Sequence, residues 1–98
     1  MTFELRYTPT AETQINAVKG DPSLAERWKA VRKALGLMEK NLRHPGLKTH
    51  KYASLAGAKG EEVFEAYAEN NTPAAFRIFW HYGPKKGQIS IVAITVHP

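Results

Sequence analysis

The spacing of hydrophobic residues changes partway along this chain, and that change limits the folds open to it. From Leu24 to Leu42, apolar side chains recur every three or four residues, which is typical of one face of an α-helix. From residue 62 onward they recur at every second residue in short segments, which is typical of β-strands. The chain has 98 residues, enough for one modest core. We therefore expect a single α+β domain over residues 1–98.

Two helices are predicted in the first half of the chain. The first covers residues 11–19, with Thr10 as its capping residue. The second begins at Ser23, where Glu26 has the spacing of a capping box, and continues to about Asn41. The two should form a hairpin. Cations that lie off the apolar stripe of the second helix are expected in solvent: Arg27, Lys29, Arg32, Lys33 and Lys40.

One strand is predicted before the helices and three after them. Residues 3–7 alternate between apolar and polar side chains. The later segments, joined by turns short enough for antiparallel pairing, are 62–69, 76–82 and 88–96. Residues 43–61 mix cations with glycine and proline, and we interpret them as a basic loop with at most a brief ordered piece at 52–55. The expected fold is one twisted sheet, consisting of the N-terminal strand and a three-stranded antiparallel meander, with both helices on one face.

Alternation also assigns the side chains of the late strands to two faces. The helix-covered face receives Phe64, Ala66, Ala68, Phe76, Ile78, Trp80, Val92, Ile94 and Val96. The opposite face is expected to be open and to gather ionisable side chains beside the basic loop: Glu65, Tyr67, Arg77, His81 and His97. Such a surface can support RNA cleavage by an internal 2′-hydroxyl, because that reaction needs acid–base groups and positive charge. It needs neither a metal nor a cofactor, and we predict none.

The charge balance points to polyanions or acidic protein segments as partners. Lysine and arginine number 14 against 9 acidic residues, a net charge of +5. Candidates for contacts with RNA phosphates are Lys48, His50, Lys51, Lys59 and His81. The chain has no cysteine, and His44 and His50 lack the spacing of a metal site. No apolar run approaches the ~20 residues that span a bilayer, so we expect a cytoplasmic protein without a membrane partner.

The order of elements and several motifs resemble the RelE/ParE toxin superfamily over nearly the whole chain. Three of these motifs are Tyr7-Thr8-Pro9-Thr10-Ala11, the basic stretch 44–51 and a C-terminal apolar strand that ends in His97. The most specific is Phe76-Arg77-Ile78-Phe79-Trp80, which is similar to the family's aromatic-Arg-aliphatic-x-aromatic strand. Taken together, these features identify the expected fold.

The resemblance implies a toxin that controls bacterial growth and is neutralised by an antitoxin encoded beside it. Many members bind the ribosomal A site and cleave mRNA there. By resemblance, Arg77 stands where the nuclease branch keeps the arginine that contacts the scissile phosphate, and His97 stands near its terminal catalytic histidine or arginine. Glu65 and Tyr67 fall in a strand where some relatives place catalytic lysines, so this chain is closer to members that use a carboxylate and a histidine.

Three functions stay open at this stage. The chain is a ribosome-dependent mRNA endoribonuclease, a ParE-like inhibitor that binds gyrase without chemistry, or an inactive homologue that binds only the antitoxin. Without the family motif, an ion pair of Arg77 with Glu65 or Glu69 across the strands is the ordinary interpretation. The expected partners are an acidic antitoxin, the ribosome and mRNA. A homodimer and a heterotetramer with the antitoxin are both compatible with the sequence.

The gene adjoining this one is expected to encode a short acidic protein, because a chain of net charge +5 attracts an acidic, partly disordered segment. Expression of this chain alone should arrest growth of a host with susceptible ribosomes and gyrase, and co-expression of the neighbour should relieve the arrest. Unimpaired growth in such a host would contradict both toxin interpretations and leave the inactive homologue.

Overall fold

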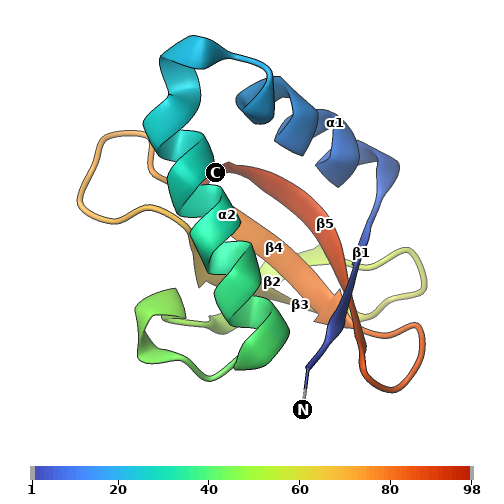
Figure 1. Cartoon of the computed structure of the whole chain (residues 1–98). Helices are drawn as coiled ribbons and strands as arrows, with labels where there is room; N and C mark the ends of the chain where they lie inside the picture. The colour runs from blue at the N-terminus through green and yellow to red at the C-terminus, as the bar shows by residue number, and fades with distance from the viewer. Residues whose placement is uncertain (1, 98) are drawn as a thin grey trace.

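The computed structural model describes residues 2–97 and confirms the α+β class, with helices on one face of a five-stranded sheet (Figure 1). The helices are α1 (Pro9–Lys19) and α2 (Ala25–Lys40). The strands are β1 (Glu4–Tyr7), β2 (His50–Ala56), β3 (Glu62–Tyr67), β4 (Phe76–Tyr82) and β5 (Gln88–Val96). Short 3₁₀ turns, η1 (Pro22–Leu24) and η2 (Pro45–Leu47), precede α2 and β2. No helix within residues 2–97 is long and apolar enough to cross a membrane.

The sheet has the order β1-β5-β4-β3-β2. The predicted meander is confirmed, since β3, β4 and β5 pair as antiparallel neighbours, and β1 adds to β5 in parallel. Two register positions matter for function. Glu65 lies between His50 of β2 and Phe79 of β4, and Tyr67 lies opposite Arg77. Strand pairing therefore brings together residues that are far apart in the chain.

The assignment of residues 43–61 to a loop is wrong, because β2 forms a full strand at the edge of the sheet. An edge strand has one neighbour and needs no apolar alternation, and most side chains of β2 are exposed. Its pairing with β3 is irregular between Lys51 and Ala56. The turn back into β3 closes through Gly60, whose φ of +83° lies in the left-handed region that favours glycine.

Both predicted helix starts need correction. Thr8, and not Thr10, caps α1, because its hydroxyl oxygen accepts from the backbone N–H of Ala11 at 3.1 Å. The capping box at Ser23 is wrong as well. The Asp21 carboxylate accepts from the backbone N–H and the hydroxyl of Ser23 and caps η1, which delays the start of α2 to Ala25. These hydrogen bonds lower the pKa of Asp21.

The core lies between the helices and the sheet. Its buried members include Ala11, Val31, Leu35, Met38, Leu47, Ala66, Ile78, Trp80, Ile89, Ile91 and Ile94. Strand β5 carries an extra residue there: Phe79 lies opposite Ala93, whereas Trp80 lies opposite Ile91. The bulge returns Ile94 to the helix side after Ile91, so both isoleucines are core residues. The assignment of Val92 to the core face is wrong, because Val92 is the extra residue and is only partly buried.

The prediction that the cations of α2 lie in solvent is wrong for Arg27. The Nε atom of Arg27 donates to Glu69 Oε1 at 2.9 Å, and Nη2 donates to the carbonyl of Ala74 at 3.1 Å. Its guanidinium also lies over the ring of Phe76, 4.1 Å from the centroid. Arg27 therefore fastens α2 to the β3–β4 turn, next to the strands that carry the candidate site.

Replacing Arg27 by alanine should lower the free energy of unfolding by about 1–3 kcal/mol, because it leaves the partly buried Glu69 carboxylate without its charged donor. The matched control is Arg32→Ala on the exposed side of the same helix, which should stay within about 0.5 kcal/mol of the parent. Urea denaturation measures both. Equal stability of the two variants would mean that the contact does not hold α2 in solution.

Candidate functional site

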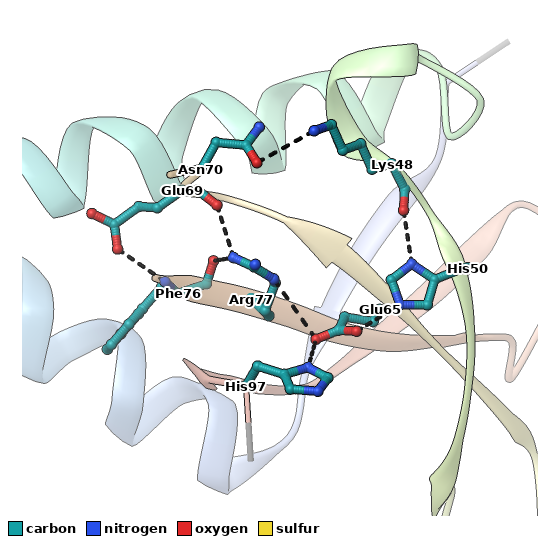
Figure 2. Close-up of polar contacts among 8 residues, drawn as sticks. All are labelled: Lys48, His50, Glu65, Glu69, Asn70, Phe76, Arg77 and His97. Carbon is teal, nitrogen blue, oxygen red and sulfur yellow. Dashed lines mark hydrogen bonds and ion pairs between the residues drawn. The ribbon is translucent and has the colours of Figure 1, made fainter. Parts of the chain in front are cut away.

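A buried carboxylate lies at the centre of the ionisable side chains. Glu65 projects from β3 on the face away from the helices and is only 1% exposed. Its Oε1 atom is 2.7 Å from Nε2 of His50, and its Oε2 atom bonds to Nδ1 of His97 (Figure 2). Arg77 Nε lies 3.8 Å from the same Oε2. The sheet face predicted to be open is therefore covered at this point, and Glu65 is enclosed by side chains from β2, β4 and the residue after β5.

Both ring nitrogens of His50 have hydrogen-bond partners. Nδ1 lies 2.9 Å from the carbonyl oxygen of Lys48, and a carbonyl only accepts hydrogen bonds, so Nδ1 carries a hydrogen. Nε2 lies 2.7 Å from Oε1 of Glu65. His50 therefore joins the backbone of Lys48 to the buried carboxylate and covers one of its oxygens.

His97 uses only one ring nitrogen in the protein. Nδ1 bonds to Glu65, and the side chain is 50% exposed. Nε2 has no hydrogen-bond partner among residues 2–97. A histidine that donates one nitrogen to a buried carboxylate and presents the other to solvent is oriented for proton transfer at the second nitrogen. This geometry suits an acid–base role.

Arg77 is held more firmly than an open sheet surface would require. Its guanidinium carbon lies 3.6 Å from the centroid of the Tyr67 ring. Nη1 donates to the backbone carbonyl of Glu69 at 2.8 Å, and the side chain is 14% exposed. Of the two ion pairs foreseen as alternatives for Arg77, the pair with Glu65 is present. Arg77 reaches Glu69 only through the backbone carbonyl, because the Glu69 carboxylate pairs with Arg27. The remaining nitrogen, Nη2, is the part of the fork without a partner within the described chain.

Lys48 adds a second cation beside Tyr67. Its ammonium lies 5.4 Å from the centroid of the Tyr67 ring and 3.5 Å from Asn70 Oδ1. The side chain of Lys48 is exposed, as a phosphate contact requires. The structure thus groups six predicted site residues: Lys48, His50, Glu65, Tyr67, Arg77 and His97.

Three predicted RNA contacts lie away from this group. Lys51 is exposed and pairs with Glu62 at 3.4 Å. Lys59 lies in the turn between β2 and β3. His81 is 7% exposed, and its Nδ1 bonds to the carbonyl of Tyr82 at 2.7 Å. The structure does not bring these side chains to Glu65.

Tyr52 also lies in this group, although no sequence pattern pointed to it. Its ring lies 5.6 Å from the ring of His97 and 5.0 Å from that of Phe79, measured between centroids. It stands two residues after His50 on β2, hence on the same face of the strand. That spacing would have revealed it if residues 50–56 had been recognised as a strand. Within residues 2–97, no group of three or more histidine or acidic residues is placed to hold a metal ion.

Comparison with solved structures finds the same fold in several toxins. A YoeB/ParE toxin from Agrobacterium tumefaciens superposes with a TM-score of 0.71 at 9% identity, covering 98% of this chain and 100% of that one. The YoeB dimer from Staphylococcus aureus gives 0.66 at 12% identity, with full coverage of both chains at 100%. RelE in the archaeal RelE-RelB complex from Pyrococcus horikoshii gives 0.64 at 13% identity, covering 98% and 96%.

These likenesses define the class: the chain has the fold of the RelE/ParE-like toxins. The predicted resemblance is confirmed at the level of the fold. No family model and no curated protein sequence matches the chain.

His50→Ala should lower the free energy of unfolding by about 1–3 kcal/mol, since it leaves one oxygen of a buried carboxylate without a partner. In a Glu65→Leu background the same change should cost much less, because the carboxylate is already gone. Urea denaturation of the four proteins gives the coupling, and exposed Lys51→Ala is the control on the neighbouring position. Equal costs in both backgrounds would mean that His50 does not stabilise Glu65.

Proposed function

We propose that this protein is the toxin of a type II toxin–antitoxin pair and that it cleaves mRNA at the ribosome, with His97 as the proton-transfer group. The fold supports the toxin role, since the structures that share it are YoeB and RelE toxins. The archaeal relative was solved as a complex with RelB, which supports an antitoxin as partner here. We place the activity in the cytoplasm, where ribosomes and mRNA are found.

The observation that carries the enzymatic part is the bond between His97 and Glu65. A carboxylate that is 1% exposed cannot reach an RNA hydroxyl, and both of its oxygens are already bonded to imidazoles. Glu65 therefore acts through His97, by holding the hydrogen on Nδ1 and leaving Nε2 to accept a proton. This differs from a role for Glu65 itself as the base.

The reaction then follows from the chemistry of RNA. Nε2 of His97 removes the proton of a 2′-hydroxyl, and the oxygen attacks the adjacent phosphorus. The bond from phosphorus to the 5′ oxygen breaks, leaving a 2′,3′-cyclic phosphate, and the departing oxygen takes a proton from solvent. No metal and no cofactor takes part in this scheme.

Positive charge beside the imidazole stabilises the phosphate during attack. The guanidinium of Arg77 is held by its hydrogen bond to the Glu69 carbonyl and its ion pair with Glu65, and it can present Nη2 to the phosphate. The exposed ammonium of Lys48 supplies a second, more mobile positive charge. Both cations lie over the ring of Tyr67, the Arg77 guanidinium carbon at 3.6 Å and the Lys48 ammonium at 5.4 Å from its centroid. Exposed Lys51 and Lys59 contribute less specific attraction to RNA further from the reacting atoms.

Purified protein added to a reconstituted translation reaction should create new mRNA 5′ ends, mapped by primer extension. His97→Ala should slow cleavage by ~10² to 10⁴, because it removes the general base. Arg77→Ala should slow it as well and should also cost stability, since Arg77 bonds to the Glu69 carbonyl. The control is Lys86→Ala, an exposed cation in the β4–β5 turn, which should cleave like the parent.

Two outcomes would contradict the proposal. Cleavage by His97→Ala at the parental rate would remove His97 from the reaction. No cleavage by the parent, together with inhibition of gyrase supercoiling, would make the chain a ParE-like inhibitor instead.

A further inference from the structure

The orientation of His97 is not set by the sheet. Strand β5 ends at Val96, so His97 lies one residue beyond the paired backbone. Its ring is fixed by side chains alone. On one side Nδ1 bonds to Glu65, and on another the ring of Tyr52 meets it edge-on, with an interplanar angle of 75°. One hydrogen bond leaves a ring free to turn about that bond, and the second contact removes this freedom.

The ring of Tyr52 is itself held in place by the ring of Phe79. Its ring lies 5.0 Å from the ring of Phe79, within the usual range for paired aromatic side chains. Phe79 is 1% exposed and lies in the middle of β4, next to Glu65 in register. The rings of Phe79, Tyr52 and His97 are therefore in successive contact, from the central strand β4, through the edge strand β2, to the residue after β5.

We propose that Tyr52 is a positioning residue for His97. Its ring, supported by Phe79, keeps the imidazole turned so that Nδ1 faces Glu65 and Nε2 faces solvent. The importance of this for cleavage rests on the function proposed above, whereas the positioning of the ring can be measured without any substrate.

The ring of Tyr52 performs this role, and its hydroxyl does not. The hydroxyl makes no hydrogen bond to any residue in the described part of the chain, whereas the ring contacts two neighbours. Tyr52→Phe therefore keeps the contact with His97, and Tyr52→Leu loses the edge-on packing. Leu55→Ala, an exposed change on the same strand, controls for general weakening of β2.

The test combines nitrogen NMR of the His97 ring with cleavage kinetics. In the parent, Tyr52→Phe and Leu55→Ala, the ring nitrogen shifts should report one hydrogen held on Nδ1. In Tyr52→Leu they should move toward the average of two tautomers. The kcat of the leucine variant should fall by about 10²-fold, as expected for a misplaced reacting group, with little change in KM. Tyr52→Phe should restore it. If the leucine variant does not fold, Tyr52→Met is used in its place, because methionine keeps an apolar contact with Phe79.

Unchanged His97 shifts in both the leucine and methionine variants would overturn the proposal. Equal loss of activity in Tyr52→Phe would overturn it too, because the hydroxyl would then be the part that acts. A parent that does not cleave RNA, combined with displaced His97 shifts in Tyr52→Leu, would contradict the proposed nuclease and support the positioning role.

Discussion

The arrangement of this site follows from the need to neutralise one buried carboxylate. An ionised carboxyl removed from water costs several kcal/mol unless charges and hydrogen-bond donors replace the lost water. Glu65 receives them from three directions: His50 of β2, Arg77 of β4 and His97 after β5. Those donors come from segments that only the folded sheet brings together, so the complete fold is a condition for the site.

The same contacts make an acidic residue compatible with the RNA binding proposed for this surface. His50 and His97 bond to the two oxygens of the Glu65 carboxylate and cover them. The remaining exposed charge around the site is positive, from Lys48 and the partly exposed Arg77. In the proposed reaction, a phosphate that approaches His97 would therefore meet cations and an imidazole, while the carboxylate stays behind them.

The sequence was most informative where one physical requirement acts alone. The stripe from Leu24 to Leu42 predicted the long helix because that helix has one buried face. Alternation likewise placed Arg77, Glu65 and His97 on one face of the sheet. It did not predict how deeply Glu65 is buried, since period two distinguishes faces and carries no information on what covers them.

The errors about the sheet lie in β2 and in the bulge of β5, and each has its own cause. An edge strand with exposed side chains has no hydrophobic pattern to reveal it, so His50 was assigned to a loop and Tyr52 was overlooked. The extra residue at Val92 changes the faces within one strand, which a uniform alternation cannot represent. The fold could be predicted because the hydrophobic core follows a regular pattern. The site could be predicted only in part, because the edge strand β2 that covers Glu65 has no such pattern.

The place of β2 in the sheet also determines how the site comes apart. Strand β2 has a single partner, and we expect such an outer strand to open at a lower free energy than the central strands, without global unfolding. When β2 separates from β3, Glu65 loses His50 and His97 loses Tyr52 in one event, although the helices and the core stay folded. We therefore expect the lifetime of this arrangement of side chains to be a local property, reported by hydrogen exchange at the β2 amides and not by the melting temperature of the whole protein.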